Sequence, residues 1–204
     1  MTSEHSAAKS QFTADSTPLP DTQARIVSAA LACVKRWGVE KVTLNDIARE
    51  AGVTRPTVYS YFKTRDDVIR FALLQSAFGF AQKLFQHING FHSPEGRFLE
   101  SFLFALKHLP EEPYLELVTD AGLSSILKQH ALNAPDGLQI ARQLVQHIFL
   151  GQELAADDLN EITEIAMRLL LSLLMVEGPT SRTDEEMRDF LRRRLLPAVG
   201  LGLS

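Results

Sequence analysis

The chain of 204 residues contains one cysteine, one tryptophan and no long uninterrupted apolar run. A single cysteine excludes a disulfide within the chain, and we expect Cys33, which lies on an apolar helical face, to pack in a core. The most apolar run, residues 165–176, is broken by Arg168 and Ser172. It is also shorter than the roughly 20 residues that a membrane-spanning helix needs. Because no apolar signal-peptide core is found near the start, we expect a protein of the reducing cytoplasm with no membrane partner.

Sequence motifs of catalysis and metal binding are also absent. The histidines, at positions 5, 87, 92, 108, 130 and 147, include no His-x-x-x-His pair, and the chain has no Cys-x-x-Cys. It has neither a Gly-x-Ser-x-Gly turn nor a glycine-rich phosphate loop. We therefore expect no catalytic residue, no metal and no cofactor. An enzyme is the weakest interpretation of the chain.

Charge is distributed unevenly along the chain. Residues 21–75 carry nine Lys or Arg and six Asp or Glu, a net charge of +3, whereas residues 76–204 carry −6. A basic end on an acidic body suits a protein that presents one end to phosphates. The overall charge of −4 argues against an unspecific polycation that coats nucleic acid.

Helical periodicity follows a polar, aperiodic segment at residues 1–20, which we expect to be a disordered arm. Residues 22–37 form a clean amphipathic stripe that ends at Gly38. Capping residues and prolines place further helices at about 65–88, 94–108, 111–119, 123–132, 137–150, 157–177 and 184–200. We find no strand alternation and no internal repeat. With 45% hydrophobic residues, the chain can bury a proper core.

Residues 43–62 predict two short helices joined by a tight turn. Thr43 can cap the first helix, with the carboxylate of Asp46 near its positive end. Gly52 supplies the left-handed conformation that ends this helix. Thr54 caps the second helix, where Pro56 is tolerated because the first turn makes no intrahelical use of its N–H.

The second of these helices exposes polar and cationic side chains. At about 100° per residue, Val58 and Phe62 share one face, and the remaining side chains point away from it. Such a helix suits the DNA major groove, although two packed helices with an incidentally polar surface would give the same shape. We expect base or groove contacts from Arg55, Thr57, Tyr59 and Ser60 and phosphate contacts from Thr43, Tyr61 and Lys63, and we count Thr54 and Pro56 among the DNA-binding residues as well.

On these residues, the segment from 22 to about 73 resembles the DNA-binding domain of the TetR family of bacterial transcriptional regulators. The matching segments are 26–30, Trp37-Gly-Val39, Val42-Thr-Leu44, Asp46-Ile-Ala48, Ala51-Gly-Val53, Thr57-Val-Tyr-Ser-Tyr-Phe-Lys63 and Asp66-Asp-Val68. They cover about a quarter of the chain, and the rest resembles the family only in length and helical character.

The resemblance implies an all-α fold of about nine helices. After the arm at residues 1–20, a three-helix helix-turn-helix domain at residues 21–66 would be joined by a long helix to an effector-binding and dimerisation domain at residues 67–204. It also implies that Lys63 and the amides at the start of the following helix grip the DNA backbone. The long helix would transmit the ligand signal.

Two further sets of residues are candidates in the second domain. The helix at 162–176 is apolar almost all round, and the family pairs its last two helices with a symmetry mate, although burial within one subunit would give the same pattern. The expected interface residues are Ile165, Leu169, Ser172, Leu173, Met187, Phe190, Leu191 and Leu195. A ligand pocket could be lined by Phe78, Phe85, Phe104, His108, Tyr114, His130, Met167 and Met175, for which ordinary packing is the commoner role.

The sequence thus favours a homodimeric transcriptional repressor that a small-molecule effector releases from a palindromic DNA operator. Two-fold pairing would place the reading helices about one DNA turn apart, roughly 34 to 36 Å. An activator of the same fold remains open. So does a helical ligand-binding protein without DNA affinity, which would lack the steep salt dependence of duplex binding. No residue identifies the effector.

Overall fold

The computed structural model describes residues 19–112, 135–176 and 178–201, and only the backbone of residues 135–137. Within these ranges all regular elements are helical, with eight α-helices and three short 3-10 helices. None of these helices combines the length and the apolarity that crossing a bilayer requires. The helices expected at about 111–119 and 123–132 lie mostly or wholly outside the described residues.

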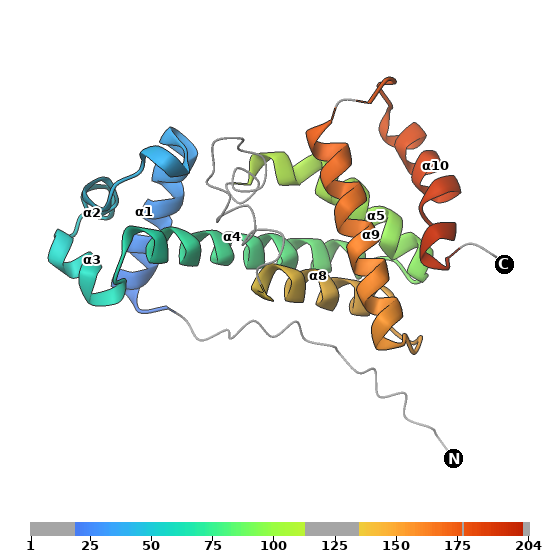
Figure 1. Cartoon of the computed structure of the whole chain (residues 1–204), viewed down its shortest axis with the longest axis horizontal. Coiled ribbons are helices and arrows are strands. Elements are labelled where there is room, and N and C mark those ends of the chain that lie inside the picture. The colour runs from blue at the N-terminus through green and yellow to red at the C-terminus, as the bar shows by residue number, and fades with distance from the viewer. Residues whose placement is uncertain (1–18, 113–134, 177, 202–204) are drawn as a thin grey trace, which may run out of the picture.

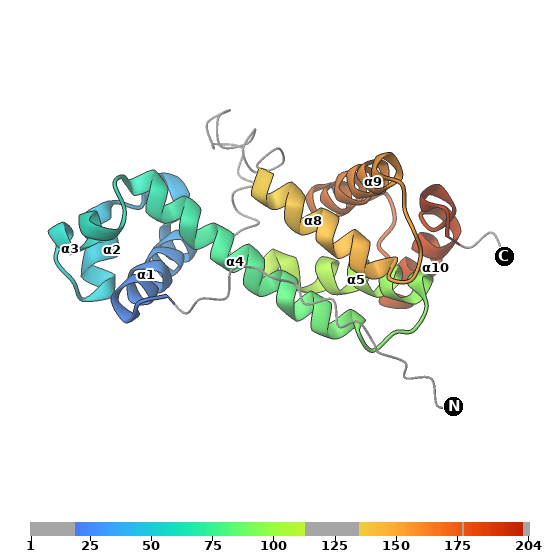
Figure 2. The same cartoon turned by 90° about the horizontal axis from the view of Figure 1, so that it is seen from below.

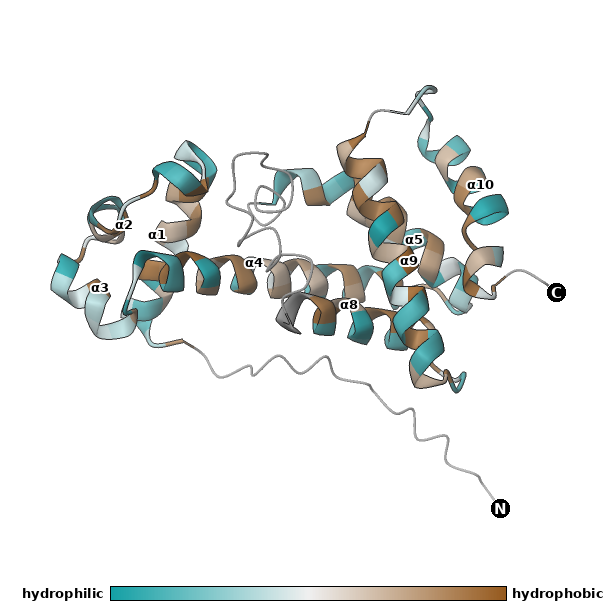
Figure 3. Cartoon of the chain, viewed as in Figure 1, coloured by the Kyte–Doolittle hydropathy of each residue, from teal (hydrophilic) through white to brown (hydrophobic). Residues whose placement is uncertain are grey.

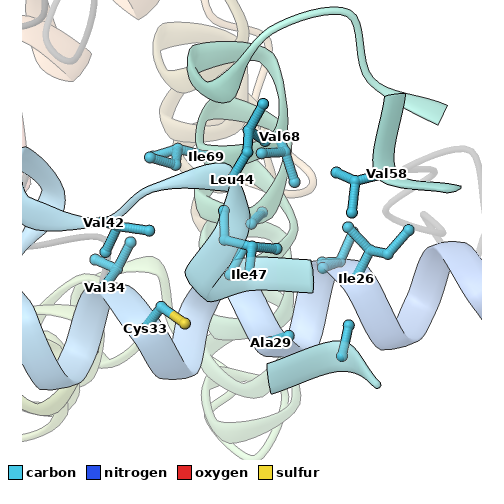
Figure 4. Packing of buried hydrophobic residues seen from close by; sticks show 14 of the residues in the cluster. Ile26, Ala29, Cys33, Val34, Val42, Leu44, Ile47, Val58, Val68 and Ile69 are labelled. Carbon is cyan, nitrogen blue, oxygen red and sulfur yellow. The ribbon is translucent and has the colours of Figure 1, made fainter. Parts of the chain in front are cut away.

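The amino-terminal end of the molecule is a small helical unit with its own core. It consists of α1 (Asp21–Trp37), the 3-10 helix η1 (Val39–Lys41), α2 (Leu44–Ala51), α3 (Arg55–Tyr61) and the first turns of α4 (Arg65–Ile88). The buried residues between Ile26 and Leu73 form one apolar cluster, which we call the head core. Figure 4 shows side chains of α2, α3 and α4 converging on those of α1.

The rest of the described chain packs around a second cluster, the body core, formed by the buried residues between Phe80 and Leu201. It is built by α4, α5 (Pro94–His108), η2 (Leu109–Glu111), α8 (Pro135–Ile148), α9 (Ala156–Met175), α10 (Asp184–Arg194) and η3 (Pro197–Val199). Helices α5 and α8 pack on α4, α9 packs on α5 and α8, and α10 packs on α5. In Figures 1 and 2, α2 and α3 lie at one end of the molecule and α10 at the other.

Helix α4 belongs to both cores. Its start is fixed by a capping box, in which Thr64 N–H donates to Asp67 and Asp67 N–H donates to Thr64 Oγ1, both at 3.1 Å. The first turns place Val68 and Leu73 in the head core, and the later turns place Phe80 and Ile88 in the body core. The change of core therefore occurs inside one continuous helix, beyond residue 66.

Two expected helix boundaries were wrong, both near prolines. The last helix was expected to reach residue 200, but α10 ends at Arg194 and only the 3-10 turn Pro197–Val199 follows. Pro197 has no N–H with which to continue the helical ladder. Helix α8 begins at Pro135, two residues before the expected start at 137, because a proline is accommodated in the first turn of a helix.

A buried histidine lies where the end of α4 meets α8. His147 is 8% exposed, and its Nε2 lies 2.7 Å from Oδ1 of Asn89 at the end of α4. Phe85 contacts the ring edge-on, with 4.8 Å between ring centroids. The Nδ1 atom has no hydrogen-bond partner among the described residues. Burial, with a smaller contribution from the nearby Arg97, lowers the pKa of His147 below its ordinary value of 6.5.

We predict that the protein loses stability in mild acid through His147. Above pH 6.5 the ring is neutral in both the folded and unfolded states, whereas at lower pH the unfolded state takes up the proton first, so the free energy of unfolding falls. Urea denaturation at about pH 7.5 and about pH 5.5 measures this loss. The loss of unfolding free energy between the two pH values should be smaller for His147→Gln than for the wild type. For His92→Gln, which alters an exposed histidine, the loss should equal that of the wild type. Equal losses in all three proteins would contradict the prediction.

Candidate nucleic-acid interface

The α2–turn–α3 unit is fixed by local hydrogen bonds that the sequence anticipates. At the start of α2, Asp46 N–H donates to Thr43 Oγ1 at 3.2 Å, and Thr43 N–H donates to Asp46 at 3.1 Å. The hydrogen bonds from Thr43 lower the pKa of the Asp46 carboxyl, so the charged form of the cap is favoured. Gly52 then adopts the left-handed conformation, with φ 63° and ψ 36°, and ends the helix.

Helix α3 buries very little of its own surface. Val58 is fully buried and is the only residue of α3 in the head core, and Phe62 follows directly and packs on Phe71 with ring centroids 5.5 Å apart. The side chains of Arg55, Pro56, Tyr59, Ser60 and Tyr61 are exposed, and Thr57 is half-buried. This outward face matches the wheel that the sequence predicts.

Several of the expected DNA-contacting side chains are held in place by neighbours on the same helix. Arg55 donates from Nη2 to the hydroxyl of Tyr59 at 3.0 Å, and its guanidinium carbon lies 5.4 Å from the centre of that ring. Ser60 Oγ donates to the carbonyl of Thr57 at 2.7 Å. Arg55 and Tyr59 therefore form one cationic, aromatic surface on α3, the helix that lies at the end of the molecule opposite α10 (Figure 1).

Three other expected contacts, Thr43, Thr54 and Lys63, lie outside α3. Thr54 caps α3, with its hydroxyl 2.8 Å from that of Thr57 and accepting from the Thr57 N–H at 3.4 Å. Lys63 is exposed in the short connection that leads to the cap of α4. Thr43, by contrast, gives its hydroxyl proton to Asp46 at 2.6 Å, so it can donate to a phosphate only after exchanging partners.

A cavity of about 180 Å³ lies in the body, between α4, α5, α8 and α9. Its described lining is Ala77, Phe80, Ala81, Leu84, Phe98, Ser101, Phe102, Ala105, Leu109, Ile140, Ala141, Leu144, Val145, Ile148, Thr163, Ala166, Met167, Leu170 and Leu171. None of these side chains is charged. The two hydroxyls donate to their own helices, Ser101 to Phe98 at 2.7 Å and Thr163 to Leu159 at 2.6 Å.

Of the residues expected to line a pocket, Met167 does so. Phe104 and His108 instead contact each other with ring centroids 4.5 Å apart, and Phe85 packs against His147. Phe78 is half-buried outside the lining, and Met175 is half-exposed near the end of α9. These five residues therefore lie outside the described lining of this cavity. Tyr114 and His130 lie outside the described residues.

The residues expected at a dimer interface divide into three groups by exposure. Ile165 and Ser172 are exposed on α9, and Leu169, Leu173, Met187 and Phe190 are half-buried against the body core. Leu191 and Leu195 are 0% and 3% exposed within one chain, so they are core residues and are withdrawn from the interface set. Figure 3 shows the carboxyl-terminal half of α9 as predominantly apolar, and Val176, which follows it, is 63% exposed.

Comparison with known proteins finds the same organisation elsewhere. A family model described as bacterial regulatory proteins of the tetR family matches residues 26–70. The regulator SrpR of Pseudomonas putida is 29% identical over 169 residues, which are 81% of this chain and 78% of that protein. Residues 26–70 thus match the TetR family, and the chain resembles a helix-turn-helix transcriptional regulator along most of its length.

Other likenesses are shorter or more distant in sequence. An uncharacterised helix-turn-helix regulator of Mycobacterium tuberculosis is 62% identical over 39 residues, a match that spans only 21% of its length. The solved structure of the TetR-family repressor AlkX from a Dietzia strain superposes with a TM-score of 0.61 at 19% identity, covering 86% of this chain and 96% of that one. The multidrug-binding protein EbrR, in complex with imidazole, gives a TM-score of 0.62 at 21% identity, covering 86% and 95%. At these identities the structures show the fold alone.

Two arginines that sequence reasoning missed hold the amino-terminal head together. Arg25 on α1 donates from Nη2 to the carbonyl of Ala51 at 2.7 Å, at the end of α2. Arg65, the first residue of α4, donates from Nε to the carbonyl of Val42 at 2.5 Å. Their acceptors are backbone atoms more than 20 positions away, which no local spacing rule can indicate.

Proposed function

We propose that this protein is a sequence-specific DNA-binding repressor of the TetR family, with α3 as its reading helix. The observation that carries the proposal is the outward face of α3, where a cation, two aromatic hydroxyls and a serine are exposed around one buried valine. Arginine reads guanine in the major groove, and hydroxyls reach phosphates and base edges. The net charge of +3 on residues 21–75 favours approach to the DNA backbone.

The decisive experiment selects bound duplexes from a random DNA pool and measures the affinity of the selected duplex at several salt concentrations. Specific binding should weaken steeply with salt, because each neutralised phosphate releases counterions. A ligand-binding protein without DNA affinity would enrich no sequence. Reporter expression from the selected operator should rise when the protein is removed if it represses, and fall if it activates.

Arg55→Ala should weaken operator binding by about 1–3 kcal/mol and relax base preference at one position in each half-site. The reason is that one bidentate contact to a base edge carries discrimination for that base alone. Titration of the operator and of its single-base variants measures both effects.

Lys63→Ala is the matched comparison for Arg55→Ala, since it removes one exposed charge from a proposed phosphate contact. It should weaken binding equally for all base variants. The same uniform loss for Arg55→Ala would assign Arg55 to the DNA backbone instead.

The proposed repressor acts as a homodimer through the exposed side of α9 and the adjacent part of α10. The supporting features are the apolar carboxyl-terminal half of α9 and the exposed fractions of Ile165, Met175 and Val176, which are 39%, 50% and 63%. A second copy would remove this apolar surface from water. Two copies would also bring two reading helices to a palindromic operator.

Ile165→Glu should convert the dimer into a monomer and abolish operator binding, because a carboxylate would be buried against apolar surface. Sedimentation equilibrium at micromolar protein measures the mass. The control is Leu150→Glu, which alters an apolar residue that is 45% exposed after α8 and outside the proposed interface, and should leave the dimer intact. A wild-type chain that sediments as a monomer would overturn this part of the proposal.

The effector of the proposed repressor is a small, neutral, apolar molecule that occupies the body cavity. An engineered apolar cavity of about 150 Å³ binds benzene, so about 180 Å³ suits a molecule built around one ring. The two hydroxyls in the wall already donate to backbone carbonyls, and a charged ligand would find no counterion in the described lining. Helix α4 supplies four wall residues, so occupancy acts directly on the helix that reaches the head.

Toluene should stabilise the protein and release it from the operator, whereas benzoate should do neither. At a concentration ten times its Kd, a ligand adds about 1.4 kcal/mol to the free energy of unfolding, which thermal denaturation detects. Ala77→Leu, which fills the cavity from α4, should abolish both effects while leaving operator binding intact. The control Gln82→Leu places the same side chain at an exposed position of α4 and should respond as the wild type does. A response retained by Ala77→Leu would place the effector elsewhere.

A further inference from the structure

The guanidinium of Arg65 connects the start of α4 to the segment that precedes α2. Its Nε donates to the carbonyl of Val42 at 2.5 Å, and its Nη2 donates to the carbonyl of Val39. Its Nη1 donates to Asp66 at 2.8 Å. Val39 and Val42 are 2% and 1% exposed and lie in the connection between α1 and α2. One side chain therefore spans two carbonyls of a buried connection.

These contacts close the helix-turn-helix unit at its base. Val42 immediately precedes Thr43, the cap of α2, and Arg65 immediately follows Thr64, the cap of α4. Everything between them, α2, the turn and α3, is a loop of chain whose two ends meet at one guanidinium. Arg25 holds the middle of this loop to α1 through the carbonyl of Ala51.

Closure matters most for α3, because α3 has little packing of its own. Val58 is the one residue of the helix in the head core, with Phe62 just beyond its end. A helix of seven residues with one buried side chain is not oriented by that side chain alone. Its direction relative to α4 depends on how the ends of the surrounding loop are held.

The contacts of Arg65 also argue against a role in binding a DNA phosphate. Three of its nitrogens are engaged within the protein, and Asp66 supplies a negative charge beside it. The Arg65 side chain is 29% exposed, whereas Lys63, two positions earlier, is exposed. The Nε and Nη2 atoms are held by the two carbonyls, and a DNA phosphate that approached Nη1 would meet the carboxylate of Asp66 there.

We propose that Arg65 is a positioning residue for DNA reading: it sets the orientation of α3 relative to α4 by joining both ends of the helix-turn-helix unit, and it contributes no phosphate contact. The inference rests on the proposed DNA-binding function. By the same contacts, Arg65 would transmit a displacement of α4 to α2 and α3. Because the planar fork of arginine is needed to span two carbonyls, lysine does not replace it.

The charge-preserving variant Arg65→Lys isolates this role. Operator affinity should fall at least tenfold, while affinity for a non-specific duplex of equal length and the salt dependence of binding remain those of the wild type. Lys63→Ala is the comparison: specific and non-specific affinities should fall together, and the slope of log affinity against log salt should lose about 0.9 per subunit. Asp66→Asn, which leaves both carbonyl contacts in place, should keep wild-type specificity.

Hydrogen exchange of the free protein provides a readout that does not depend on DNA. In Arg65→Lys the amides of α2 and α3 should exchange faster than in the wild type, while those of α1 and of the body helices keep their rates. Faster exchange throughout the head would indicate general destabilisation and would overturn a specific positioning role. So would wild-type operator affinity in Arg65→Lys.

The remaining outcomes are also decisive. An Arg65→Ala variant that loses salt slope as Lys63→Ala does would make Arg65 a phosphate contact. If the wild type bound no duplex specifically, that result would reject the proposed DNA-binding function. The role of Arg65 in orienting α3 would be rejected separately, by amide exchange in α2 and α3 that is the same in Arg65→Lys as in the wild type.

Discussion

The continuity of α4 is the constraint on which the rest of the molecule depends. One helix contributes Val68 and Leu73 to the head core and Phe80 and Ile88 to the body core, with no break between them. Its backbone hydrogen bonds run unbroken through the segment that joins the two cores, so neither core can turn freely relative to the other. At 1.5 Å per residue the helix is about 36 Å long. Any ligand that displaces α4 in the body therefore displaces the head.

The sequence predicted best what is decided locally. The starts of α2 and α4 follow from capping residues, Thr43 with Asp46 and Thr64 with Asp67, because a threonine and a carboxylate three residues apart satisfy the free amides of a first turn. The outward face of α3 follows from its wheel. The predicted end of α10 was wrong, because the apolar stripe continues past Pro197 although the helical hydrogen bonds do not.

What remained beyond sequence reasoning depends on contacts between distant segments. The cavity could not be located, because its walls include small residues such as Ala77, Ala81 and Ala105, which carry no signal of their own. An apolar stripe does not reveal whether it packs inside one chain or between two, and so Leu191 was assigned to an interface although it is fully buried. Arg65 looked like part of a capped helix start, and only the fold brings Val42 to its side chain.

The contacts at the two ends of α4 suggest how a neutral ligand could act over this distance. The far end of α4 is anchored to three helices: His87 lies 3.2 Å from the carboxylate of Glu100 on α5, Glu100 accepts from Arg188 on α10, and Asn89 meets His147 on α8. The part of α4 that lines the cavity lies between these contacts and the head core. A tilt of about 5° pivoting on them would move the first turn of α4 by about 3 Å. Because a ligand shifts an equilibrium only by its differential affinity for the two states, an uncharged molecule in this cavity has to act through the space it fills.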